Sequence, residues 1–132
     1  MQPASRTPAI VFGSYCVLVW ATRIRNALGQ DDLSAGGKTV AVGVATMFTL
    51  GGLAVLVAAL RRAHLAAAVR VLAAVTVVYW PVRVVQIALA DHGAGFVAVH
   101  AALGVVSVAL ALLAWSRSVA PRPGNVRTGA VL

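Results

Sequence analysis

A short stretch of the chain, Tyr79-Trp80-Pro81-Val82-Arg83, places a proline and an arginine inside a run of otherwise apolar residues. A charged side chain inside a bilayer is costly, so such an arginine is expected to have a polar partner, to reach water or to bind a ligand. A guanidinium group suits carboxylate or phosphate recognition because its N–H donors form a planar fork. Arg83 is therefore the first residue to consider as the charge of a binding site.

Helical spacing identifies the residues that would accompany Arg83. Thr76, Tyr79, Arg83 and Gln86 follow one another at i, i+3, i+7 and i+10, which places them in one stripe along a helix. His100 enters the next apolar segment from the same membrane side. At a rise of 1.5 Å per residue, Arg83 and His100 lie about 10 Å and about 7 Å from the ends of their helices. We predict an outward-opening site lined by Tyr79, Arg83, Gln86 and His100.

A purely structural interpretation of the same residues is the alternative. Pro81 removes a backbone donor and frees the carbonyl of Val77, so a kink is expected there. Arg83 would then bind that carbonyl, or it would pair with a loop carboxylate. His100 would act as a neutral hydrogen-bonding group between helices. The carboxylates available for such a pair are Asp31, Asp32 and Asp91.

Other kinds of chemistry find less support in the sequence. A bis-histidine haem needs two histidines that face each other across helices, and only His100 lies well inside an apolar segment. Asp91, His92 and His100 match no metal-binding motif. No carboxylate lies inside an apolar segment, and no Ser/His/Asp spacing indicates a nucleophile. We therefore expect no catalysis, no metal and no cofactor.

The elements that would position these residues are membrane-spanning helices. Of the 132 residues, 61% are hydrophobic and 11% are charged, against about 25% charged in soluble domains. A spanning helix needs about 20 apolar residues. The sequence therefore predicts an all-α, four-helix, up-down-up-down bundle as a single membrane domain over residues 1–132. Its helices are expected at 8–28, 39–60, 69–90 and 96–115, followed by a flexible basic tail at 118–132.

The basic residues lie mostly at the ends of the apolar segments, so the net charge of +8 indicates lipid headgroups as partners and argues against nucleic acid. Arg23 and Arg25 are expected to reach the interface by extending their side chains. One side of the predicted bundle would carry three basic residues, Arg23, Arg25 and Lys38. The other would carry seven, which places both termini in the cytoplasm of a cell-membrane protein. These seven are Arg6, Arg61, Arg62, Arg70, Arg117, Arg122 and Arg127.

The two halves of the chain share a pattern. Trp20-x-x-Arg23 followed by Asp31 recurs 60 residues later as Trp80-x-x-Arg83 followed by Asp91. We hypothesise two tandem hairpin repeats, related by an axis along the membrane normal because each hairpin would start on the same side. Chance similarity between two apolar hairpins is the alternative.

The second predicted helix has a face of small and hydroxyl residues, Thr39, Gly43 and Thr46, with Thr49 and Gly52 close by, which suits close helix packing in lipid. So little mass lies outside the membrane that partners would meet the protein mainly through such helix faces. The sequence therefore favours a non-catalytic accessory or interaction component of the cell membrane. Its expected partners are the lipid bilayer and either a second copy of the chain or other membrane subunits. The alternative is a solute- or lipid-binding or transport protein with an outward-facing pocket around Arg83 and His100.

Overall fold

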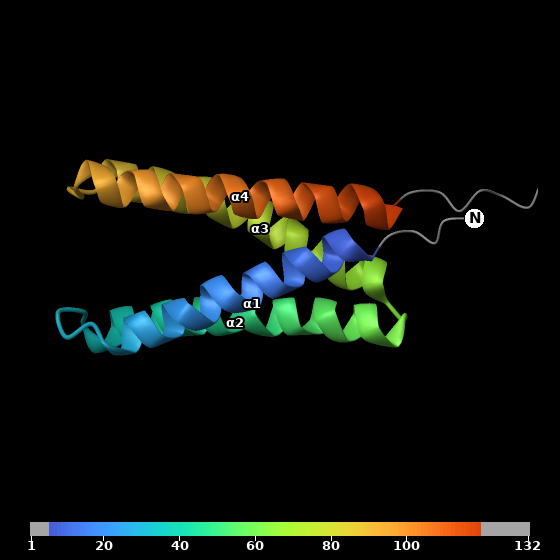
Figure 1. Cartoon of the computed structure of the whole chain (residues 1–132). Helices are drawn as coiled ribbons and strands as arrows, with labels where there is room; N and C mark the ends of the chain where they lie inside the picture. The colour runs from blue at the N-terminus through green and yellow to red at the C-terminus, as the bar shows by residue number, and fades with distance from the viewer. Residues whose placement is uncertain (1–5, 120–132) are drawn as a thin grey trace, which may run out of the picture.

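The computed structural model describes residues 6–119 and folds them into four α-helices (Figure 1). The helices are α1 (Thr7–Leu28), α2 (Ala35–Arg61), α3 (Leu65–Leu89) and α4 (Ala94–Val119). No strand occurs among residues 6–119. All four helices are long and apolar enough to cross a bilayer. The prediction of an all-α membrane protein with four helices is therefore confirmed.

The helix ends differ from their predicted positions where capping decides them. α2 begins at Ala35 and not at Thr39, because the Ser34 hydroxyl oxygen accepts a hydrogen bond from the backbone N–H of Gly37 at 3.1 Å. α4 continues to Val119, beyond its predicted end. The rest of the predicted flexible tail, residues 120–132, lies outside the described residues. Hydropathy alone does not reveal a cap, so it misplaces these ends by about one turn.

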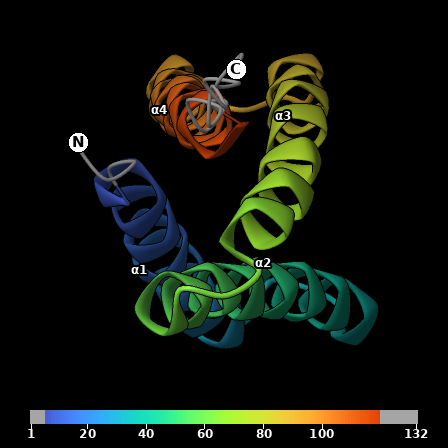
Figure 2. The same ribbon diagram turned by 90° about the vertical axis from the view of Figure 1, so that its right-hand side faces the viewer.

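The helices form two hairpins, α1 with α2 and α3 with α4 (Figures 1 and 2). The loops at 29–34 and 90–93 lie at the same end of the molecule, here called the loop end, where the two hairpins diverge (Figure 1). The start of α1 and the short link between α2 and α3 lie at the other end (Figure 1). Contacts within each hairpin are more extensive than contacts between the hairpins. The hairpins are therefore the natural structural units of the fold.

The first hairpin is held by an unusually close helix approach. A Cβ atom built on Gly52 would lie 2.8 Å from the carbonyl oxygen of Gly13, and one built on Gly13 would lie 3.0 Å from the carbonyl oxygen of Gly52. The face of α2 that packs therefore contains Gly52, together with Ala45 and Phe48. Of the small residues predicted to pack, Gly52 does so, whereas Thr39, Gly43 and Thr46 are exposed. No atom lies within 4 Å of a Cβ built on Gly43.

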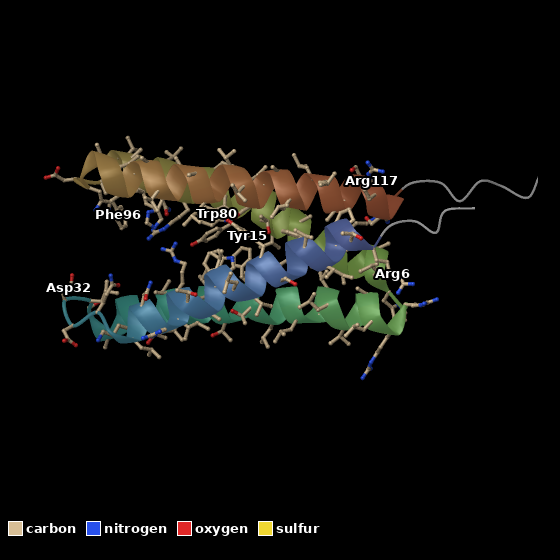
Figure 3. The ribbon with its side chains drawn as sticks, in the orientation of Figure 1. Arg6, Tyr15, Asp32, Trp80, Phe96 and Arg117 are labelled. Atoms are coloured by element: carbon tan, nitrogen blue, oxygen red, sulfur yellow. The ribbon has the colours of Figure 1, made fainter. Side chains whose placement is uncertain are left out.

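Aromatic side chains join the two hairpins near the middle of the molecule. Trp20 stacks on Phe48 with ring centroids 4.3 Å apart, and its ring lies 5.4 Å from Tyr79 and 5.8 Å from Trp80. The Tyr15 hydroxyl donates a hydrogen bond to the carbonyl of Leu103 in α4 at 3.3 Å. Figure 3 shows Trp80 and Tyr15 between the hairpins. We call Trp20, Phe48, Tyr79 and Trp80 the aromatic cluster.

Most of the outer surface of the helices is apolar. Large aliphatic side chains such as Leu18, Val71 and Val105 are about two-thirds exposed. A soluble monomer rarely exposes so much contiguous apolar surface, whereas lipid covers it in a membrane. The exposure pattern therefore agrees with a membrane-embedded bundle.

Candidate functional site

The candidate site lies just beyond the aromatic cluster, toward the loop end. Arg23 follows Trp20 by three residues in α1, and Arg83 follows Trp80 by three residues in α3. Residues three apart share a helix face. Because Trp20 and Trp80 contact each other across the two hairpins, the helices bring both arginines to the same region.

Arg23 contacts the second hairpin directly. Its Nη2 atom lies 3.4 Å from Nε2 of His100, and its guanidinium carbon lies 5.6 Å from the ring centroid of Trp20. The second distance is within the range of a cation–π interaction. The side chain is only partly exposed. The sequence predicts Arg23 to be an interfacial residue, and this prediction misses its contact with His100. Its match to Arg83 in the Trp-x-x-Arg pattern is the signal that indicates a place in the site.

His100 is 8% exposed and has a defined hydrogen-bonding role. Its Nδ1 atom lies 2.9 Å from the carbonyl oxygen of Phe96. A carbonyl oxygen only accepts hydrogen bonds, so Nδ1 carries the proton. In the neutral ring, Nε2 then presents its lone pair and accepts a long hydrogen bond from Arg23. The histidine thus orients Arg23, and no hydrogen bond among the described residues joins it to Arg83.

Arg83 is partly buried and short of acceptors. Its Nη1 atom donates a long hydrogen bond of 3.4 Å to Oε1 of Gln86, one turn later in α3. Its Nε atom is buried without an acceptor among residues 6–119. Neither a carboxylate nor the carbonyl of Val77 is within bonding distance of Arg83 in the described part of the chain. The α3 helix continues through Pro81.

The structural interpretation that paired Arg83 with an acid is therefore wrong for the described residues. The only ion pair among residues 6–119 joins Lys38 to Asp31, whose Nζ and Oδ1 atoms are 4.0 Å apart. Asp31 is fully exposed in its loop, and Asp32 and Asp91 are exposed as well. Water solvates these carboxylates at the loop end, so they do not neutralise the arginines.

Tyr79 belongs to the aromatic cluster more than to a polar site. Its ring meets Trp20, Phe48 and Trp80 edge-on, at centroid distances of 5.4, 5.1 and 6.1 Å. Its hydroxyl makes no hydrogen bond to another described residue. The structure thus places Arg83 and Gln86 together as predicted, while His100 meets Arg23 and Tyr79 packs against rings.

The site as a whole is rich in hydrogen-bond donors and poor in acceptors. Besides the two guanidinium groups, the indole Nε1 of Trp80 is buried without an acceptor among the described residues. The charges of Arg23 and Arg83 also repel each other. Within the described range, no three His, Cys, Asp or Glu side chains are grouped so as to hold a metal. Chemically, the arrangement suits an anion.

The residues that define the candidate site are Arg23, Arg83, Gln86 and His100, next to Trp80 of the aromatic cluster. Compared with protein-family models, with curated proteins and with solved structures, the chain finds no match.

Proposed function

We propose that this small multi-pass membrane protein binds an anionic solute or lipid headgroup between its two hairpins, near the loop end. One observation carries the proposal: two arginines in membrane-spanning helices meet in one region, and no acid among residues 6–119 neutralises them. Unpaired charge inside a membrane is costly. A bound anion would compensate that cost.

Extension of both side chains to the water interface is the main competing explanation, and their contacts argue against it. Arg23 contacts Trp20 and His100. Arg83 contacts Gln86, and its Nε atom is buried. An arginine that only needed water would keep its guanidinium group exposed. Both side chains are only partly exposed and contact other protein groups instead, which favours a ligand.

The proposed site faces the outside of the cell membrane. Arg61, Arg62 and Arg117 belong to the end opposite the loop end, and Figure 3 shows Arg6 and Arg117 there. An excess of basic residues marks the cytoplasmic side of membrane proteins. Both termini would then be cytoplasmic, and an anion would reach the site from outside.

Binding can be tested by intrinsic tryptophan fluorescence, because Trp20 and Trp80 lie beside the site. The purified protein in a zwitterionic detergent should give a saturable change when sulfate or an anionic lipid is added. Arg83→Gln should remove this response, since it removes one of the two charges. Arg25→Gln is the matched control, because Arg25 is exposed on the same helix as Arg23. An Arg83→Gln response equal to that of the wild type would contradict the proposal.

An accessory role remains the second candidate, and the outer face of α2 favours it. Gly36, Thr39, Gly43 and Thr46 are exposed along that face, and a Cβ built on Gly36 or Gly43 has no atom within 4 Å. A partner helix could approach such a face closely. Gly43→Leu should then release a partner that co-purifies after mild solubilisation, while anion binding stays unchanged. Equal recovery of that partner with Gly43→Leu would exclude this face.

A further inference from the structure

We infer that the ligand is a doubly charged oxyanion, such as a phosphate or sulfate group, held by Arg23 and Arg83 together across the two hairpins. The inference rests on the proposed function and specifies its ligand. It is carried by three observations: the equivalence of the two arginines, their shared location, and the lack of acceptors around them.

The two arginines occupy equivalent positions in the two hairpins. The buried residues of α1 and α3 match one another at a constant offset of 60 positions. Those of α1 are Ala9, Phe12, Gly13, Cys16, Trp20 and Ala27. Those of α3 are Val69, Leu72, Ala73, Thr76, Trp80 and Ile87. Chance similarity of two apolar helices would not require the same buried positions, so the match supports the hypothesis of tandem repeats.

The second helices of the hairpins match in the same way. Ala45, Phe48, Gly52 and Val55 are buried in α2. Their counterparts in α4, at an offset of 59, are Gly104, Ser107, Ala111 and Ala114. The offset falls from 60 to 59 because the loop before α4 is shorter than the loop before α2. If the two hairpins are repeats that start on the same side, a twofold axis along the membrane normal relates them.

The equivalent residues meet at this axis. Trp20 and Trp80, which correspond to each other, have ring centroids 5.8 Å apart. Arg23 and Arg83 follow them by one turn, so they lie on either side of the same axis, where their charges repel each other. One anion on the axis would interact with both guanidinium groups. Two positive charges are neutralised by a single ligand only if that ligand carries two negative charges.

The hydrogen-bonding groups of the site specify the ligand further. Nε2 of His100 already accepts from Arg23, and Oε1 of Gln86 already accepts from Arg83. The buried groups without partners among the described residues, Nε of Arg83 and Nε1 of Trp80, are both donors. A ligand that brings only lone pairs satisfies such a site, whereas one that carries its own N–H or O–H groups does not. Sulfate and a doubly ionised phosphate monoester have this property and accept forked bonds from arginine.

The group could belong to a phospholipid that enters between the hairpins or to a soluble anion, and the chemistry is the same for both. The experiment uses the full-length protein in nanodiscs of zwitterionic lipid. Sulfate, inorganic phosphate and acetate are titrated, with tryptophan fluorescence as the readout. In a parallel arm, the nanodiscs contain phosphatidic acid, whose phosphate can carry two charges, or phosphatidylglycerol, whose phosphate carries one.

Sulfate should bind at least about tenfold more tightly than acetate, because acetate satisfies one guanidinium and leaves the other charged. Inorganic phosphate, which keeps an O–H group near neutral pH, should bind more weakly than sulfate. Arg23→Gln and Arg83→Gln should each weaken sulfate binding about 10- to 100-fold, the usual effect of losing hydrogen bonds to a charged group. Both variants should also lose the preference for sulfate over acetate. Arg25→Gln should bind as the wild type does. A response to phosphatidic acid without a response to soluble sulfate identifies a lipid as the ligand, and the reverse identifies a solute.

The contrary outcomes distinguish failure of the doubly charged ligand from failure of anion binding itself. If acetate binds as tightly as sulfate and Arg83→Gln abolishes both, anion binding stands and the doubly charged ligand is wrong. If Arg83→Gln abolishes binding while Arg23→Gln does not change it, the two arginines do not act together. If no anion binds the wild type, both proposals fail. Should either variant not fold, thermal unfolding of the wild type still decides: sulfate must raise its stability saturably, at concentrations too low for the general stabilising effect of excluded salts, and acetate must not.

Discussion

At the scale of single residues, His100 shows how one ring can join two hairpins. It donates to its own helix through Nδ1 and accepts from α1 through Nε2. Phe96, whose ring centroid lies 4.1 Å away, packs against the same imidazole. The histidine therefore fixes Arg23 without adding a charge beside two guanidinium groups.

Two substitutions at His100 should distinguish the loss of its hydrogen-bond acceptor from the loss of its packing volume. His100→Leu leaves Arg23 partly buried without its neutral acceptor, so we expect the free energy of unfolding to fall by about 1–3 kcal/mol. His100→Gln keeps an acceptor and should lose less. The measurement is thermal or denaturant unfolding of the purified protein in detergent. The control is His92→Leu, since His92 is exposed in the 90–93 loop; equal losses for Leu and Gln at position 100 would contradict the assigned role.

The sequence predicted part of this site, for a clear reason. Spacing within one helix placed Arg83 and Gln86 on the same face, and they do bond to each other. The helical rise also predicts the depth of His100 in the membrane. The contact of His100 with Arg23 was not predictable, because contacts between hairpins depend on how the helices cross. The pairing of Arg83 with a loop acid failed because Asp31, Asp32 and Asp91 stay in water.

At the scale of helices, α2 has two small-residue faces, and only one of them packs within the chain. The sequence does not distinguish them, because Gly43 and Gly52 both permit close approach. The face with Gly52 packs, since Ala45, Phe48 and Val55 complete an apolar surface against the rest of the bundle. The Gly43 face stays exposed. Hydropathy thus predicts that a helix exists, while side-chain fit decides its rotation.

Alanine substitution at the two glycines should therefore have opposite effects. Gly52→Ala puts a methyl group 2.8 Å from the backbone oxygen of Gly13, which forces the helices apart, and should reduce stability by about 1–3 kcal/mol. Gly43→Ala meets no atom and should leave stability unchanged or raise it by up to about 1 kcal/mol, as expected for alanine in a helix. Thermal unfolding followed by circular dichroism in detergent measures both. A Gly52→Ala protein as stable as Gly43→Ala would show that the close approach is absent in the membrane.

At the scale of the whole molecule, hydropathy predicted the number and type of the elements because four apolar segments use most of the chain. It could not predict how the hairpins meet, since lipid is as apolar as the helix surfaces and gives no hydrophobic preference between them. That arrangement depends on the aromatic cluster and on the bond from Tyr15 to Leu103. The proposed site therefore depends on contacts between residues far apart in sequence.

The repeat and the charge distribution together predict how the molecule lies in the membrane. If the hairpins are equivalent, the loops at 29–34 and 90–93 must face the same side, and the basic residues at the opposite end place that side outside. Single cysteines introduced at Ser34, Ala63 and Gly93 in a Cys16→Ala background report this directly. An impermeant maleimide added to intact cells should label positions 34 and 93. Position 63 should react only after permeabilisation.

Labelling at positions 34, 63 and 93 also tests the membrane orientation and the equivalence of the hairpins separately. Labelling of 63 alone in intact cells would invert the orientation but keep the hairpins equivalent, and the site would then open to the cytoplasm. Labelling of 34 without 93, with both reactive after permeabilisation, would show that the loops face opposite sides. In that case Arg23 and Arg83 could not share an axis along the membrane normal, because equivalent residues would lie at opposite depths. The joint binding of one anion by both arginines therefore requires that 34 and 93 react together.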